Sequence, residues 1–137
     1  RMGDEATRMA RMVRSIIESG AARSLPSSDL RVAADLASGL LRKALDAFAR
    51  LDTRAALAIL KEDDAIDREF DGFVRKLITY MMEDARTISA SLDLLFLAKA
   101  IERIGDHSKN IAELIIYLVE GKDVRHQPLQ DIESAIQ

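Results

Sequence analysis

The sequence predicts an all-α fold, an up-down three-helix bundle preceded by one further helix. Apolar residues recur at spacings of three and four along almost the whole chain of 137 residues, which is the pattern of helices with one buried face. The two prolines, Pro26 and Pro128, lie in short polar stretches outside these periodic runs. Tight turns between successive long helices favour antiparallel neighbours, and therefore a bundle.

Composition narrows the class of protein. Hydrophobic residues make up 48% of the chain, enough to fold around a core rather than remain disordered. The net charge of −3 argues against nucleic-acid binding, because a phosphate backbone favours a basic surface. The lack of cysteine excludes disulfides and thiolate metal sites and is compatible with a reducing cytosol. The apolar run "LIIYLV" is far shorter than the roughly 20 residues that span a bilayer.

The first predicted helix covers about residues 1–18, and Gly20 is expected to end it. Its opening, "RMGDEATRMA", is similar to "RIGDHSKNIA" near the other end of the chain. We therefore interpret this segment as the last helix of a preceding, similar bundle. Since residue 1 is Arg rather than Met, we expect the chain to be part of a longer one, and the first helix to pack on the bundle or on another copy.

Polar residues with short side chains delimit the helices of the bundle. The second helix is expected to run to about Arg50, the third to about Asp84 and the fourth to near Gly121. The expected N-terminal caps are Ser27 or Ser28 for the second helix, Asp52 or Thr53 for the third, and Ser89 or Ser91 for the fourth.

These boundaries divide the chain into three parts. Residues 1–20 form the remnant helix of a first repeat, residues 27–122 form a complete three-helix repeat, and residues 123–137 form a C-terminal tail. The apolar positions of the tail indicate a short terminal helix or a docking turn: Leu129, Ile132 and Ile136.

One carboxylate of the third helix falls where a charge is costly. On a helical wheel, Asp63 lies inside the apolar arc and Asp67 at its edge, whereas Asp64 and Asp71 lie beyond it on the solvated face. An ionised Asp in an apolar stripe needs a paired group or a bound cation. Asp63 is therefore predicted to have such a partner.

The fourth helix carries a second set of polar residues. Glu102, Asp106 and Asn110 are spaced four apart and stack on one face, away from the main apolar positions of the helix. Spacing alone leaves a purely surface role open, in which Lys99 and Arg103 form ion pairs with the acids.

The two sets of acids together indicate a metal site. Asp63 and Asp67 form one acid-x₃-acid pair, and Glu102 and Asp106 form another on the next, antiparallel helix. Carboxylates one turn apart on two packed helices can supply several oxygen ligands to one cation or a small cluster. Oxygen-only ligands suit magnesium, manganese and ferric iron.

Other catalytic or ligand patterns are absent from the sequence. His107 is rotated by about 100° from Asp106 on the helix, and we interpret both His107 and His126 as surface or boundary residues. No Glu-x-x-His occurs, which counts against a ferritin-like di-iron oxidase. The sequence contains neither a nucleophile elbow nor a P-loop.

Three stretches of the chain resemble the PhoU family, whose signature is E(D)xxxD: residues 45–52, 74–88 and 100–126. Asp63-x₃-Asp67 and Glu102-x₃-Asp106 match that signature. The family is built from two three-helix repeats. The resemblance therefore implies that the chain holds the second PhoU-like repeat and the last helix of the first, in which Asp4 is what remains of the motif.

The resemblance also implies a function. PhoU-like proteins are cytoplasmic regulators, not enzymes, that link the ATPase of a phosphate-specific ABC transporter to a sensor histidine kinase and hold the phosphate-starvation response off. They reach the inner membrane through the transporter, commonly form homodimers, and in some members carry iron or zinc, in others magnesium or manganese. The implied metal ligands are Asp63, Asp67, Glu102, Asp106, the partial motif at Asp4, and Asn110.

Two other interpretations stay open. The same carboxylates could serve a metal-dependent enzyme or a metal-storage bundle, although the only candidate general bases are then the ligands themselves. Alternatively the carboxylates are structural, in which case Asp63 pairs with Arg103 or Lys99 and no metal binds.

Overall fold

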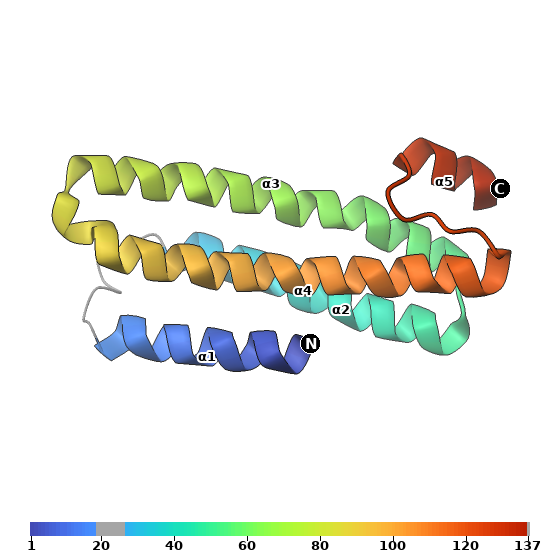
Figure 1. The fold of residues 1–137 in the computed structure, drawn as a ribbon, viewed down its shortest axis with the longest axis horizontal. Coiled ribbons are helices and arrows are strands. Elements are labelled where there is room, and N and C mark those ends of the chain that lie inside the picture. Colours follow the sequence, from blue (N-terminus) through green and yellow to red (C-terminus); the bar gives the residue numbers. More distant parts are fainter. Residues whose placement is uncertain (19–26, 137) are drawn as a thin grey trace.

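The computed structural model describes residues 1–18 and 27–136 of the chain. Long helices lie side by side in an elongated bundle (Figure 1), and no strand occurs among the described residues. The helices are α1 (Met2–Glu18), α2 (Ser27–Arg50), α3 (Thr53–Glu83), α4 (Ile88–Glu120) and α5 (Leu129–Ile136), with one 3₁₀ turn, η2 (Ala85–Thr87).

Helix α4 is the central element. It packs against α1, α2 and α3, while α5 packs on α3. Helices α2, α3 and α4 run alternately up and down, and α1 lies along α4 (Figure 1). The predicted all-α, up-down three-helix bundle with an additional N-terminal helix is therefore confirmed, as is the expectation that this helix packs on the bundle.

The core combines small residues with branched aliphatic ones. On α2 the buried positions include Ala37, Ala44 and Ala47, which are at most 1% exposed. Small side chains let neighbouring helices approach closely, and larger residues fill the space between them at the density of a protein interior. The large side chains that are fully buried in the helices of the bundle are Leu40, Ile59, Ile66, Leu77, Ile115 and Ile116.

Two of the predicted helix boundaries are confirmed by local geometry. The Asp52 side chain accepts a hydrogen bond from the Ala55 backbone N–H at 3.0 Å and caps α3. Gly121 has φ of 69° and ends α4 in the left-handed conformation, where a side chain would be strained. These residues make the turn before α3 tight and stop α4 abruptly.

The predicted cap of α4 is wrong. The helix begins at Ile88, after Thr87, and Ser91 is buried inside it. The chain turns earlier than expected because the Asp84 side chain accepts the Arg86 backbone N–H at 3.0 Å and the Thr87 hydroxyl donates to the Asp84 carbonyl at 2.7 Å. These hydrogen bonds form the turn before the chain reaches Ser89 and Ser91.

The predicted cap of α2 stays a prediction. The described part of α2 begins at Ser27, directly after residues outside the described ranges, so nothing there tests Ser27 or Ser28 as its cap. Gly20, expected to end the first helix, lies outside the described residues.

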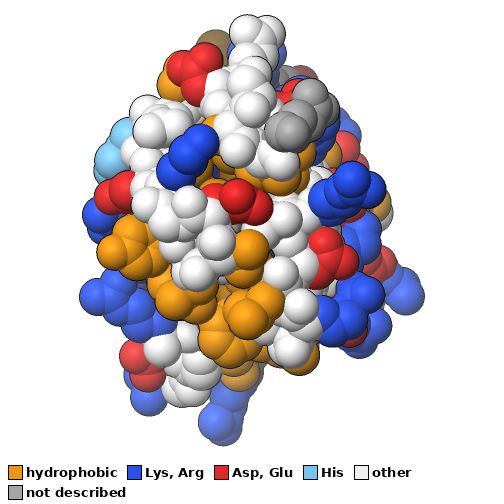
Figure 2. Space-filling model, turned by 90° about the vertical axis from the view of Figure 1, so that its right-hand side faces the viewer, with side chains coloured by type: hydrophobic (Ala, Val, Ile, Leu, Met, Phe, Trp, Pro, Cys, Tyr) orange, Lys and Arg blue, Asp and Glu red, His pale blue; other side chains and the backbone are white. Residues whose placement is uncertain are grey.

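One end of the bundle exposes apolar side chains. Figure 2 views the end at which α2 and α4 finish, and hydrophobic side chains gather there in a patch below the centre. Apolar patches of this kind are typical of surfaces that bind other proteins. No helix in the described part of the chain is long and apolar enough to cross a membrane. The exposed large apolar residues of the closing turns of α2 and α4 are Leu45, Phe48, Leu51, Tyr117, Leu118 and Val119.

Helices α3 and α4 approach most tightly at Gly105. A Cβ atom at this position would lie 3.0 Å from Oδ1 of Asp63 and 3.2 Å from Cδ1 of Ile66. Both neighbours are buried, and Ile66 has little room to retreat. The contact between the two helices at this level therefore depends on the absence of a side chain.

Gly105→Ala is expected to lower the free energy of unfolding by about 1–3 kcal/mol, because the added methyl group overpacks the contact between α3 and α4. Gly39→Ala on α2 is the matched control, since a Cβ there meets nothing within 4 Å. That change should raise stability by about 0.5–1 kcal/mol. Urea unfolding measures both, and equal effects of the two substitutions would contradict the packing argument.

Candidate metal centre

Asp63 lies in the core, at the contact between α3 and α4. The residue is 2% exposed, and its Oδ1 atom has no hydrogen-bond partner among the described residues. Leaving a buried polar atom unpaired costs roughly 1–3 kcal/mol, and more for a charged group. The burial predicted from the helical wheel is confirmed, and the carboxylate has an unsatisfied oxygen.

Three carboxylates converge at this point. One oxygen each of Asp63, Asp67 and Asp106 lie within 4.8 Å of one another. Asp63 and Asp67 are one helical turn apart on α3 and share a face. Asp106 comes from α4 and follows Gly105, whose missing side chain leaves room for Asp63. We refer to Asp63, Asp67 and Asp106 as the three-acid cluster.

The cluster is a site of concentrated negative charge. Burial, and then the charges of Asp67 and Asp106, raise the pKa of Asp63 from 3.8 to about 6. Burial also raises the pKa of Asp67, with smaller contributions from Glu102 and Asp106. Lys109 opposes both shifts. Asp63 and Asp67 are therefore harder to ionise, first because they are buried and then because other carboxylates are nearby.

The donor set of the cluster fits a hard cation. All three ligand groups are carboxylates, as magnesium, manganese and ferric iron prefer. A cation would satisfy the unpaired Oδ1 of Asp63 and offset the repulsion among the three carboxylates. The buried, unpartnered oxygen is the observation that distinguishes this cluster from an ordinary acidic surface.

The other predicted ligands lie outside the cluster. Glu102 is close enough to contribute to the raised pKa of Asp67, but its carboxylate accepts hydrogen bonds from Lys99 at 3.0 and 3.2 Å. Asp4 is exposed on α1 and lines a separate hollow that Asp106 also borders. Asn110 is exposed on α4. The roles of Glu102, Asp4 and Asn110 as ligands stay predictions.

The expectation that Asp63 pairs with Arg103 or Lys99 is wrong. Arg103 points to α1, where its Nη1 lies 3.4 Å from Oε1 of Glu5. Lys99 pairs with Glu102 and lies 5.2 Å from the ring centroid of Phe70. Arg103 therefore faces α1, and Lys99 reaches α3 at Phe70 and not at the cluster. The cluster is consequently left without an ion pair in the described part of the chain.

Sequence reasoning missed Glu5. This residue of α1 is 6% exposed and forms ion pairs with Arg103 and, at 3.7 Å, with Arg8. A signal was present, because Glu5 shares the helical spacing of four and three with Met9 and Met12. The residue holds α1 against α4 through a buried charge.

The stability of the metal-free chain should depend on pH through Asp63. The folded chain retains a proton on Asp63 up to a pKa of about 6, whereas the unfolded chain loses it near 3.8. The free energy of unfolding therefore falls as the pH rises from about 4 to 6, by on the order of 2 kcal/mol, and the loss persists above this window. Urea unfolding in chelator-treated buffers measures the effect.

Asp63→Asn should remove most of this fall, because the amide does not ionise. Asp71→Asn, at an exposed position of the same helix, is the control and should keep it. An unchanged pH slope in Asp63→Asn would show that another group is responsible.

Comparison with known proteins places the chain in a family. The family model of the PhoU domain matches residues 30–115. The chain is 45% identical to a phosphate-specific transport system accessory protein PhoU homolog of Pseudomonas putida, covering 100% of this chain and 53% of that protein. It is 54% identical to the accessory protein PhoU of Escherichia coli (strain K12) over 64% of this chain and 36% of that protein.

A solved structure supports the same assignment. The crystal structure of PhoU from Pseudomonas aeruginosa is similar to the chain with a TM-score of 0.81 and 43% sequence identity, covering 88% of this chain and 57% of that one. The chain spans about half the length of the first curated relatives that it matches. Since the family model covers more than half of the chain and the fold agrees, this chain belongs to the PhoU family.

Proposed function

We propose that this chain is part of an accessory regulator of phosphate transport that acts by binding other proteins and not by catalysis. The similarity of the whole chain to relatives named as accessory proteins of a phosphate-specific transport system carries the proposal. The bundle offers long helical faces and an exposed apolar end. The only candidate general bases that the sequence offers at the cluster are its acids themselves.

The partners that we propose are the ATPase of a phosphate-specific ABC transporter and a sensor histidine kinase. By contacting both, the regulator would hold the phosphate-starvation response off when phosphate is ample. The regulator would act in the cytoplasm, reach the inner membrane through the transporter, and work as a homodimer. Relatives named for their association with the transport system support the first of these partners.

The three-acid cluster is the proposed cation site of this regulator. Asp63, Asp67 and Asp106 would supply the ligands, with Glu102 next to them. A bound cation would satisfy the buried Oδ1 of Asp63 and draw α3 and α4 together through their shared ligands. Magnesium, manganese, iron and zinc are the candidate ions, of which the first two and ferric iron suit an all-oxygen site best.

Metal binding is tested by titrating manganese, magnesium, zinc and iron into protein purified without chelator or affinity metal. We expect stoichiometric binding and a stabilisation of about 2.7 kcal/mol at a cation concentration 100 times the Kd. Asp63→Asn and Asp106→Asn should abolish binding, whereas Asp71→Asn should preserve it. Absence of binding under saturating concentrations of all four ions would contradict the proposed site.

Partner binding is tested with the protein at its full encoded length. We expect it to co-purify with the ATPase of the phosphate-specific transporter and with the sensor histidine kinase from the same organism. An ABC transporter ATPase of unrelated specificity is the control and should not bind. Failure to bind either proposed partner would contradict the regulatory role while leaving the metal site unaffected.

A further inference from the structure

Lys109 is the lysine of α4 that faces the three-acid cluster. It follows Gly105 by four residues and therefore lies on the same face of the helix, the face that meets Asp63 of α3. Asp106, a member of the cluster, precedes it by three residues and is its neighbour on the helix surface. The half-buried Lys109 side chain is consequently directed toward the contact between α3 and α4.

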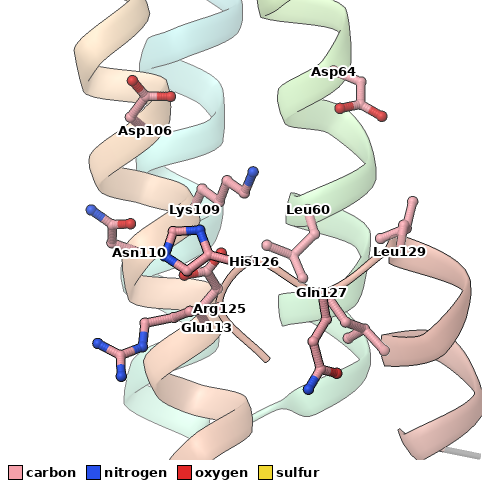
Figure 3. Close-up of a pocket in the computed structure, with 11 residues that line it drawn as sticks. Leu60, Asp64, Asp106, Lys109, Asn110, Glu113, Arg125, His126, Gln127 and Leu129 are labelled. Atoms are coloured by element: carbon pink, nitrogen blue, oxygen red, sulfur yellow. The ribbon is translucent and has the colours of Figure 1, made fainter. Parts of the chain in front are cut away.

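A cavity of about 540 Å³ gives this side chain room to move. It is enclosed by α3, by α4 and by the tail that joins α4 to α5, and both Asp106 and Lys109 line it (Figure 3). Figure 3 shows the Lys109 side chain extending from α4 toward α3, across from Leu60. The ammonium group can therefore approach the cluster or leave it without any movement of the helices.

The other lysine and arginine residues of α4 and of the cavity wall form ion pairs with acids outside the cluster. Lys109 forms no ion pair and no hydrogen bond within the described part of the chain. Its positive charge is therefore free to act on the cluster. The ion pairs that engage the other residues are Arg103–Glu5, Lys99–Glu102 and Arg125–Asp123.

The charge of Lys109 already acts on the cluster. It opposes the raised pKa of both Asp63 and Asp67, as a nearby positive charge does. A cation bound by the cluster would act on the same carboxylates with the same sign. The ammonium group and the cation therefore compete for one set of negative charges, and they repel each other when both are present.

We propose that Lys109 is the internal counter-charge of the three-acid cluster and that it determines which cations the cluster accepts. In the metal-free chain its ammonium group partly neutralises the carboxylates. A cation that enters the cluster displaces the ammonium group toward Glu113, a half-buried acid four residues further along α4 on which Lys109 also acts. The proposal rests on the proposed cation site.

The repulsion from Lys109 depends on the charge of the bound ion. By Coulomb's law a trivalent cation is repelled about one and a half times as strongly as a divalent cation at the same position. The lysine therefore lowers the affinity for both kinds of ion, and lowers the affinity for the trivalent ion more. It biases the cluster toward divalent cations such as manganese and magnesium, and against ferric iron.

The test compares manganese(II) with terbium(III), a trivalent cation that also prefers oxygen ligands. Each ion is titrated calorimetrically into the wild-type chain and into Lys109→Met, in which an uncharged side chain replaces the lysine. We expect the variant to bind manganese about 10-fold more tightly and terbium about 30-fold more tightly, because the lost repulsion is larger for the trivalent ion. A purely structural role of Lys109 would not produce this difference between the ions.

Three further variants serve as controls. Lys109→Gln is a second neutral variant and should reproduce the gains of Lys109→Met if methionine disturbs the packing. Lys109→Arg keeps the positive charge and should keep the wild-type affinity for both ions. Lys122→Met removes a lysine that does not line the cavity and should also leave both affinities unchanged.

The outcomes separate this proposal from the cation site. Manganese binding that is unchanged or weaker in both neutral variants overturns the role of Lys109 and leaves the cation site intact. Equal gains for manganese and terbium, or the same gains in Lys109→Arg, also overturn that role. Absence of manganese binding in the wild-type chain and in the variants overturns the cation site and this proposal with it.

Discussion

The burial of an ionisable carboxylate between α3 and α4 is the constraint on which the rest of this structure depends. Asp63 lies in a core that is mostly aliphatic, where a charge without a partner is costly. The helices accommodate its side chain because position 105 is glycine. The same close approach brings Asp106 next to Asp63 and Asp67. One packing contact therefore buries the unpaired oxygen of Asp63 and also assembles the three carboxylates that could bind a cation beside it.

The distribution of ion pairs on α4 explains why the cluster is not neutralised from within. Arg103 pairs with Glu5 and thereby fixes α1, while Lys99 pairs with Glu102 at the surface. Arg103 points to α1, and the Lys99 ammonium lies over the ring of Phe70 on α3, so neither cation pairs with the cluster. Lys109 acts on Asp63 from a distance and lowers its pKa only partly. The bundle thus uses its basic residues to assemble the helices and leaves the three acids with an excess of negative charge.

Helical periodicity was sufficient to predict the bundle, because each helix buries one apolar face. The predicted cap of α4 was wrong because hydrogen bonds of Asp84 and Thr87 form the turn earlier in the chain. Serine at a break between helices is a preference and not a determinant. Asp63 was predictable because it interrupts an apolar arc. The orientation of Asp106 could not be predicted. Helix α4 packs against three helices, and a helical wheel with several buried sides does not show which neighbouring helix each face meets.

Lys109 connects the three-acid cluster to Glu113, one turn further along α4. This lysine opposes the raised pKa of Asp63, and also that of Glu113, whose carboxyl is shifted upward mainly by burial. A cation bound by the cluster would add its positive charge to that of Lys109 and would lower the pKa of Asp63 and Asp67 further.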